Sequence, residues 1–256
     1  MSAILSHFLV KKSDRKNLIY IIYLKGQVIK NGLNIKRGIY MKSIACVLLL
    51  LLAFSVKAEI TIKNFHSVDS EESLYRGRQP GKLVSELPSL GITDVIIFKN
   101  DTRGEVIKEI AALKTLEIQS HHIPFRWKDY SSVQVACEQL IDAMTIMRDR
   151  REQGGRVFIH CTAGEDRTGA LAGLFRMLDE GLDRETVFRE EMCDRGFSDG
   201  NGHKPYYVTS SIQKELTPIF VAMARQIDKG YLTMNNLDRN VCKTLKVYPT
   251  KLSCER

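Results

Sequence analysis

Short apolar runs alternate with amphipathic segments along residues 60 to 228, and the two patterns predict strands followed by helices. We expect edge β structure at 60–62 and 67–68 and strands at 94–98, 117–124 and 157–160. We expect helices at 81–90, 103–113, 131–150, 168–180, 184–192 and about 205–227, the last bent at Pro218. This order predicts an α/β fold with a mostly parallel central sheet flanked by helices.

The 103–113 segment shows how the pattern assigns a buried helix face. Its apolar residues recur at helical spacing and are expected to face the core together: Val106, Ile107, Ile110 and Leu113. The longer helix at 131–150 is expected to bury Val133, Ala136, Leu140, Ala143 and Met144 in the same way. Both helices would therefore pack against the sheet.

Residues 160–169, HCTAGEDRTG, connect the last predicted strand to a helix. A helix N-terminus carries unpaired N–H groups and a partial positive charge, so it attracts phosphate-like anions. The loop amides can form an anion nest, with Gly164 at a positive φ. The same field favours a thiolate at Cys161. This loop is therefore the candidate active site.

Three more side chains of the loop have expected roles. Arg167 can hold two phosphate oxygens with its planar fork. Thr168 can donate its hydroxyl to the sulfur of Cys161, and His160 can order the loop through the backbone without transferring a proton. The remaining loop residues are expected to bind phosphate through their backbone or side chains: Thr162, Ala163, Gly164, Glu165 and Asp166.

The spacing Cys-x5-Arg within His-Cys-x-x-Gly-x-x-Arg-Thr-Gly resembles the signature of the cysteine-dependent protein-tyrosine-phosphatase superfamily. The order of elements over 63–228, the segment LYRGRQP (74–80) and the strand after Gly91 are similar to small dual-specificity phosphatases. The resemblance implies a tyrosine-phosphatase-like fold and phosphate-monoester hydrolysis through a cysteinyl-phosphate. A phosphate-sensing module without turnover is an alternative, which the intact Cys161, Arg167 and Thr168 disfavour. A sulfurtransferase is another alternative, which is disfavoured because rhodanese-type loops lack the His-Cys-x5-Arg-Thr-Gly string.

The general acid has two candidates. Asp129, in Trp127-Lys128-Asp129 before the 131–150 helix, resembles the Trp-Pro-Asp loop of tyrosine phosphatases, with Lys in place of Pro. We therefore prefer it as the proton donor to the leaving group. Asp166 is the rival, because some lipid phosphatases of the superfamily carry Cys-x-x-Gly-x-Asp-Arg. Asp129 can also simply lead into the following helix.

Residues 1–58 resemble an upstream extension followed by a secretory signal peptide. Met41-Lys42 precedes an apolar core at 44–54, and cleavage is expected before Glu59. The apolar run is short for a membrane span, although a retained anchor is the other interpretation. We therefore expect export, a phosphatase domain at 59–228, a C-terminal tail at 229–256, and no membrane anchor after cleavage.

Removal of this leader changes the charge of the chain. The whole sequence has 38 basic and 30 acidic residues, but 1–58 holds ten of the basic residues and only one acidic residue. The remaining chain has 28 basic and 29 acidic residues, a net charge of −1. A nucleic-acid partner is therefore not inferred from the apparent basicity.

Five cysteines follow the leader. Cys161 must stay reduced to act, and Cys242 with Cys254 is the expected disulfide of an oxidising compartment. Cys137 and Cys193 lie in helical patterns, where we expect small buried thiols. We expect no metal or other cofactor, because no cysteine and histidine cluster has zinc spacing.

The expected partner is a small phosphorylated substrate of a monomeric enzyme. The chain resembles the secreted bacterial tyrosine-phosphatase-like phytases in export, size and chemistry, which favours inositol hexakisphosphate over a phosphoprotein. It departs from them at Glu165 and Asp166, whose carboxylates are expected to make the pocket less electropositive. Further phosphates are expected at Lys99, Arg126 and Lys128, with His203 and Lys204 as additional candidates.

Overall fold

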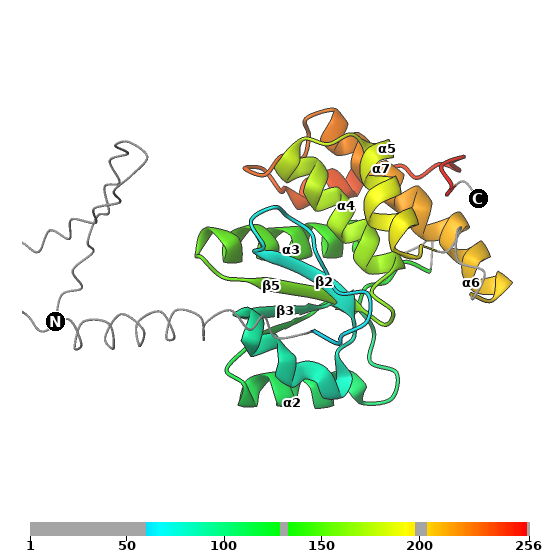
Figure 1. The fold of residues 1–256 in the computed structure, drawn as a ribbon. Helices are drawn as coiled ribbons and strands as arrows, with labels where there is room; N and C mark the ends of the chain where they lie inside the picture. Colours follow the sequence, from blue (N-terminus) through cyan, green and yellow to red (C-terminus); the bar gives the residue numbers. More distant parts are fainter. Residues whose placement is uncertain (1–59, 129–132, 198–203, 255–256) are drawn as a thin grey trace, which may run out of the picture. The chain divides into compact units, whose positions relative to one another are not determined.

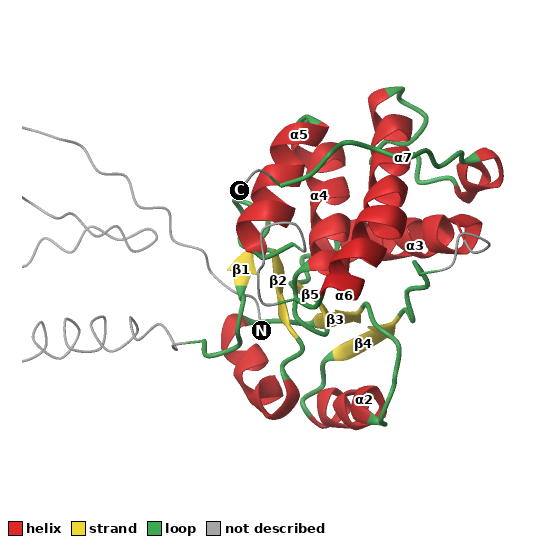
Figure 2. Ribbon diagram, turned by 90° about the vertical axis from the view of Figure 1, so that its right-hand side faces the viewer, coloured by secondary structure: helices red, strands yellow, loops and turns green. Residues whose placement is uncertain are grey.

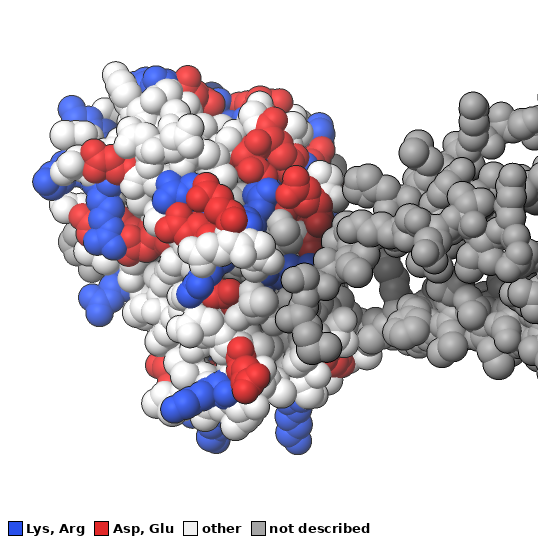
Figure 3. Space-filling view, turned by 90° about the vertical axis from the view of Figure 1, so that its left-hand side faces the viewer, with Lys and Arg blue, Asp and Glu red and all other residues white. Residues whose placement is uncertain are grey.

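The computed structural model describes residues 60–128, 133–197 and 204–254. The expected leader at 1–58 lies outside these residues, as do Asp129 and His203. Within the described parts of the chain, no helix has both the length and the apolar character to span a membrane. Figure 3 shows one face of the molecule, on which basic and acidic side chains are interspersed.

A five-stranded sheet forms the centre of the fold, in the order β1-β2-β5-β3-β4. Its strands are β1 (His66–Ser67), β2 (Leu74–Arg78), β3 (Asp94–Ile97), β4 (Gln119–His122) and β5 (Val157–Cys161). Only β1 runs antiparallel to its neighbour. The three other pairings are parallel. The predicted α/β fold with a mostly parallel sheet is confirmed.

Helices cover both faces of the sheet. On one face lie the 3₁₀ helix η1 (Gly81–Leu90) and α2 (Glu105–Thr115), and on the other α3 (Val133–Glu152), α4 (Asp166–Glu180) and α7 (Thr217–Asp228) (Figures 1 and 2). Successive residues of β3 alternate between these layers: Val95 and Ile97 join the first core, whereas Ile96 joins the second. Because strand side chains alternate, two buried faces require continuously apolar strands.

The remaining helical elements are short and follow α4. They are α5 (Arg184–Val187), η3 (Phe188–Met192), η4 (Cys193–Arg195), α6 (Tyr206–Ser211), η5 (Ile212–Leu216) and, in the tail, η6 (Arg239–Thr244). The helix expected at about 205–227 is thus three consecutive pieces. Pro218 lies in the first turn of α7, a position where proline is common. The wider π-helical turn η5 precedes it.

Two expectations from the apolar pattern are wrong. Residues 60–62 form no strand, and Ile107 of α2 is 69% exposed. Glu109 is buried on that helix instead, because its carboxylate has a buried partner, His160. Hydrophobicity alone cannot identify a buried carboxylate whose partner comes from another element.

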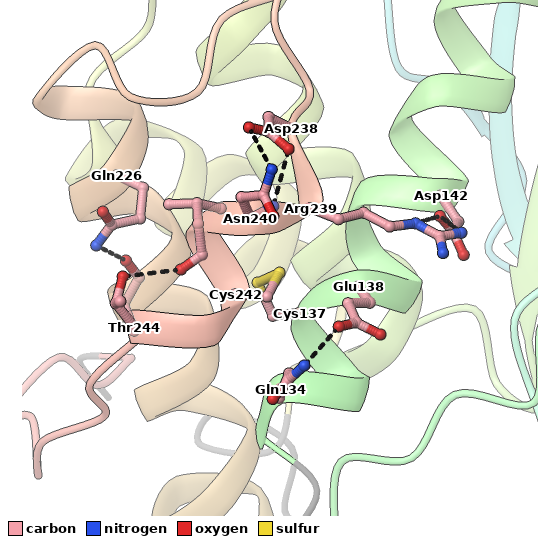
Figure 4. The surroundings of a disulfide bond; sticks show 12 residues. Gln134, Cys137, Glu138, Asp142, Gln226, Asp238, Arg239, Asn240, Cys242 and Thr244 are labelled. Carbon is pink, nitrogen blue, oxygen red and sulfur yellow. Dashed lines mark hydrogen bonds and ion pairs between the residues drawn. A yellow bond between two sulfur atoms is a disulfide. The ribbon is translucent and has the colours of Figure 1, made fainter.

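The cysteines pair differently from the expectation. Cys242 of η6 bonds to Cys137 of α3 (Figure 4), and Cys254 bonds to Cys193. The expected Cys242–Cys254 disulfide and the free thiols at Cys137 and Cys193 are therefore corrected. The two bonds fasten the tail to the domain, because each joins a tail residue to a helix that precedes it in the chain.

Polar contacts support the position of the tail on α3. Arg239 of η6 donates from Nε to Asp142 Oδ1 at 2.7 Å (Figure 4), and Arg148 donates to the carbonyl of Met234 at 2.8 Å. Leu232 and Cys242 are buried in the core on this side of the sheet. The tail therefore extends the hydrophobic core as well as being cross-linked to it.

Candidate active site

The loop after β5 is built as the sequence predicted. The strand ends at Cys161 and α4 begins at Asp166, so the loop reaches the N-terminus of a long helix. Gly164 has φ +74°, and a Cβ at this position would overlap the backbone of Gly77 and Arg78. Glycine is therefore required here by both its conformation and the close approach of β2.

Arg76 and Asn64 hold the loop by its carbonyl groups. Arg76 Nη2 and Asn64 Nδ2 donate to the carbonyl of Gly164 at 2.8 and 2.9 Å. Within the described residues, the N–H groups of Ala163, Gly164 and Glu165 donate to no protein acceptor. These three N–H groups are therefore available to an oxyanion, while Arg76 and Asn64 hold the loop backbone in place.

Arg76 is a site residue that the pattern of the sequence did not identify. Its side chain is fully buried, and Glu191 of η3 neutralises it with Nη1 and Oε2 2.8 Å apart. Burial lowers the pKa of the Arg76 guanidinium, and the carboxylate of Glu191 opposes this effect. The sequence offered little signal, because β2 reads Leu-Tyr-Arg-Gly-Arg and only the fold shows which of its two arginines is buried and paired.

Cys161 lies at the base of the loop with 3% of its surface exposed. Burial raises the pKa of its thiol, but the charge of Arg167 and hydrogen bonds from the Thr168 side chain and backbone outweigh burial and lower the pKa to about 7. The Thr168 hydroxyl is buried and has no other hydrogen-bond partner in the described chain, so it remains for the sulfur of Cys161. A large fraction of the thiol is therefore ionised near neutral pH.

His160 supports the loop from behind. Its Nδ1 lies 3.1 Å from the carbonyl of Cys161, and its Nε2 lies 2.7 Å from Glu109 Oε1. The second contact has the distance but not the angles of a hydrogen bond. Both side chains are buried, so His160 is held between the loop and α2 and has no access to solvent. This placement agrees with a supporting role.

Lys204 neutralises the two carboxylates of the loop. Its Nζ lies 2.8 Å from Glu165 Oε2 and 2.6 Å from Asp166 Oδ1, and it donates to the carbonyl of Gly196 at 2.9 Å. The two carboxylates were expected to make the pocket less electropositive. The positive charge of Lys204 offsets this effect. Burial raises the pKa of Asp166, and the charge of Lys204 opposes this shift.

A cleft of about 950 Å³ opens at the loop. Thr162 and Arg167 form one wall, where Arg167 Nη2 donates to Thr162 Oγ1 at 2.9 Å. Other residues of the lining include Lys99, Arg103, Arg126, Trp127 and Lys128. Three of the predicted cations, Lys99, Arg126 and Lys128, thus border one cleft. Arg103, which the sequence had not singled out, joins them, whereas Lys204 is not among the described residues of the lining.

The cations of the cleft differ in their availability. Lys99 is 4% exposed and bonds to Glu105 at 2.7 Å and Gln79 at 2.9 Å, so it stabilises the wall. Lys128 is exposed and lies 5.4 Å from the ring centre of Trp127. Asp129 follows these two residues but lies outside the described chain, whereas Asp166 is absent from the described lining of the cleft.

Comparisons with known proteins point to the same site. Residues 71–190 match the sequence profile of the tyrosine phosphatase family, a segment that includes β2 and the whole loop. Sixty-two residues are 36% identical to "Protein-tyrosine-phosphatase MKP1" of Arabidopsis thaliana, covering 24% of this chain. The match spans only 8% of the length of that relative. The two matches show that part of the chain is similar to tyrosine phosphatases.

Solved structures similar to the chain include TpbA of P. aeruginosa, with 20% identity, a TM-score of 0.48, and coverage of 70% of this chain and 94% of that one. Human DUSP28 has 15% identity and a TM-score of 0.46, covering 68% and 99% of the two chains. The PP-IP phosphatase SIW14 of S. cerevisiae has 20% identity and a TM-score of 0.44, covering 60% and 86%.

Proposed function

We propose that the chain is a cysteine-dependent phosphatase of the tyrosine-phosphatase superfamily that hydrolyses phosphate monoesters. The observation that supports this most strongly is the state of Cys161, whose pKa is lowered to about 7 at the N-terminal end of α4. A thiol with a lowered pKa is suited to attack phosphorus. The unpaired loop N–H groups and the Arg167 guanidinium beside it can bind the phosphate oxygens.

The proposed reaction has two steps. The Cys161 thiolate attacks phosphorus in line, forming an S–P bond, while the P–O bond to the leaving group breaks. Arg167 and the loop amides hold the equatorial oxygens as charge develops. Asp129 gives its proton to the leaving oxygen and then accepts a proton from the water that hydrolyses the cysteinyl-phosphate, which returns the thiolate. Thr168 stabilises the sulfur in both steps.

The proposed substrate is inositol hexakisphosphate or a similar inositol polyphosphate. Arg103, Arg126 and Lys128 border the cleft beside Arg167, and Lys204 compensates the acidic residues of the loop. Several cations around one phosphate site favour a substrate with several phosphates. A phosphotyrosyl or phosphoseryl protein is the second candidate, supported by the family match over 71–190.

We further propose that the protein is exported. The sequence of residues 41–58 has the three regions of a secretory signal. The two long-range disulfides support the same proposal, because such bonds persist in oxidising compartments. Edman sequencing or mass spectrometry of the exported protein should find Glu59 at the N-terminus; a cytoplasmic chain retaining residues 1–58 would contradict export.

Phosphate release from a panel of substrates tests the proposed function. The panel contains p-nitrophenyl phosphate, inositol hexakisphosphate, a phosphotyrosyl peptide and phosphoinositide vesicles. Cys161→Ser should abolish release from every active substrate while binding persists, since the alcohol is a far weaker nucleophile. Unchanged turnover in this variant would refute the mechanism, and activity confined to the peptide would reverse the order of substrates.

The same assay separates the two candidate acids. Asp129→Asn should slow esters with poor leaving groups by roughly 10²-fold or more, and p-nitrophenyl phosphate much less, because its leaving group needs no proton. Asp166→Asn is the matched variant. If Asp166→Asn shows this dependence on the leaving group and Asp129→Asn does not, the acid is Asp166.

A further inference from the structure

A second cavity, of about 430 Å³, lies against the first. Gln79, Glu105 and Thr162 line both, so the two are separated only by these shared walls. Thr162 follows the nucleophile directly in the chain, which places the second cavity beside the phosphate loop. We call it the flanking cavity.

Three cations from three different elements line the flanking cavity. They are Arg78 at the end of β2, Lys82 in η1 and Lys108 in α2. Arg78 is the register partner of Cys161 in the parallel ladder, so both lie at the carboxyl edge of the sheet. Because each cation comes from a helix or strand, the backbone positions from which the three side chains extend are fixed.

These three cations come together at one cavity, and none of them has a carboxylate partner within the described chain. Arg151 and Arg176 each contact several acidic side chains, whereas no ion pair joins Arg78, Lys82 or Lys108 to any acidic residue of the described chain. Unpaired cations gathered around a concave surface attract an anion. The flanking cavity therefore carries positive charge that no carboxylate of the described chain neutralises.

The acidic residues in its wall do not cancel this charge. Glu105 Oε1 is 2.7 Å from Lys99 Nζ, and its Oε2 accepts from the backbone N–H of Arg103 at 2.7 Å. Glu109 accepts from Gln79 at 2.7 Å and lies against His160. Glu105 is thus balanced by Lys99, and Glu109 is the one carboxylate of the wall without a lysine or arginine partner. Three cations exceed this single negative charge, so the wall keeps a net positive charge.

We propose that the flanking cavity binds a second phosphate group of the substrate whose first phosphate lies at Cys161. The proposal rests on the proposed phosphatase function and narrows it to compact molecules that carry phosphates on neighbouring positions. Thr162 and Gln79 stand between the two phosphates. A phosphotyrosyl peptide has no such group for Arg78, Lys82 and Lys108, so the cavity favours polyphosphorylated small molecules.

The experiment replaces all three cations in one variant, Arg78→Gln, Lys82→Gln and Lys108→Gln. The side chains are exposed, so the fold is expected to persist. The matched control is Lys114→Gln, Lys214→Gln and Lys229→Gln, which removes the same charge from exposed positions outside both cavities. The cavity variant should raise KM for inositol hexakisphosphate at least tenfold, with kcat/KM for p-nitrophenyl phosphate within twofold of the unmodified enzyme. The control should change neither.

A binding measurement separates this proposal from the proposed function. In the Cys161→Ser background, calorimetry gives Kd for inositol hexakisphosphate with and without the three cavity substitutions. A tenfold weaker Kd supports the cavity even if the unmodified enzyme releases no phosphate, a result that would refute only the function. Equal Kd values, a matching loss in the control variant, or no binding to Cys161→Ser at all would overturn the proposal.

Discussion

Cys161 is governed by neighbours with opposing effects on its ionisation. Burial in the protein disfavours the thiolate, whereas the Arg167 charge and the Thr168 hydrogen bonds favour it and bring the pKa to about 7. The thiolate fraction therefore falls as the pH drops below about 7, and the acidic limb of the activity profile should follow it. The nucleophilicity of Cys161 therefore depends on Arg167 and Thr168 as well as on the cysteine itself.

Replacing the Thr168 hydroxyl tests this balance. Thr168→Val removes the side-chain hydrogen bond to sulfur, so the pKa of Cys161 should rise above about 7 and the acidic limb should move to higher pH. The rate of alkylation by iodoacetamide as a function of pH measures the pKa directly. Thr115→Val, at an exposed helix end, is the control. An unchanged midpoint in Thr168→Val would show that the hydroxyl does not stabilise the thiolate.

Lys204 carries a second prediction at the residue scale. Lys204→Met leaves Glu165 and Asp166 without their cation, so their charges should oppose phosphate binding and lower kcat/KM about tenfold to a hundredfold, or roughly 1.4–2.7 kcal/mol. Adding Glu165→Gln and Asp166→Asn to Lys204→Met should restore part of the loss, because the repulsion is removed with the carboxylates. If kcat/KM of the triple variant is no higher than that of Lys204→Met, Lys204 does not act by neutralising the two carboxylates.

At the scale of elements, the site is the junction of β5, the loop and α4, fixed by β2 alongside. Arg76 in β2 bonds to the Gly164 carbonyl, and Gly164, which has no Cβ, lies against the backbone of Gly77 and Arg78. The loop is therefore shaped by its own sequence and by the strand that pairs with β5. Its N–H groups need no change of backbone when an anion arrives, which lowers the cost of binding.

Gly164→Ala should disrupt this junction. The added Cβ overlaps the backbone of β2 and φ is +74°, so we expect roughly a 10²-fold loss of activity and a loss of roughly 1–3 kcal/mol in the free energy of unfolding. Gly154→Ala is a matched control, with φ +77° and no atom within 4 Å of the new Cβ. It should cost about 1 kcal/mol and leave kcat/KM unchanged. Equal effects of both substitutions would show that the loss of activity and stability comes from the positive φ of the glycine and not from its close approach to β2.

At the scale of the molecule, the tail is part of the folded domain. Cys137–Cys242 joins residues 105 positions apart and Cys193–Cys254 joins residues 61 apart. Cross-links that close such long loops restrict the unfolded chain strongly. Cys193 lies one residue after Met192 of η3, the helix that supplies Glu191 to Arg76, so the second bond also fastens a support of the loop.

Removing the first disulfide should lower stability without abolishing the chemistry. The pair Cys137→Ala and Cys242→Ala should reduce the free energy of unfolding by roughly 4–5 kcal/mol in urea titrations, while the folded fraction keeps its kcat/KM. Peptide mapping without reductant should recover the Cys137–Cys242 and Cys193–Cys254 peptides. A Cys242–Cys254 peptide, or no loss of stability, would contradict the structure.

Much of the site could be predicted because its parts are local in the chain. The HCTAGEDRTG segment contains the nucleophile, the arginine fork and the start of the helix, so a short sequence specifies their order and spacing. The strands β3 and β5 were predictable as well, since burial on both faces requires continuously apolar residues. The strand β2 was not predicted, because Arg76, Gly77 and Arg78 interrupt its apolar pattern. Ile107 failed because the sequence pattern cannot distinguish an exposed apolar side chain from a buried one. Ile62 is buried as its apolar character suggests, but it lies in a bend and not in a strand.

The sequence by itself determined the fold class and the candidate chemistry at Cys161 and Arg167, because strand, loop and helix are contiguous and their geometry is fixed by backbone hydrogen bonding. The tertiary structure decided which residues pair with one another. Arg76 bonds to the loop carbonyl, and Lys204 contacts the acidic residues of the loop. Cys137 and Cys193 form the disulfides with the tail. Such pairings join residues far apart in the chain, and only packing of the folded elements selects one partner among several of the same chemical type.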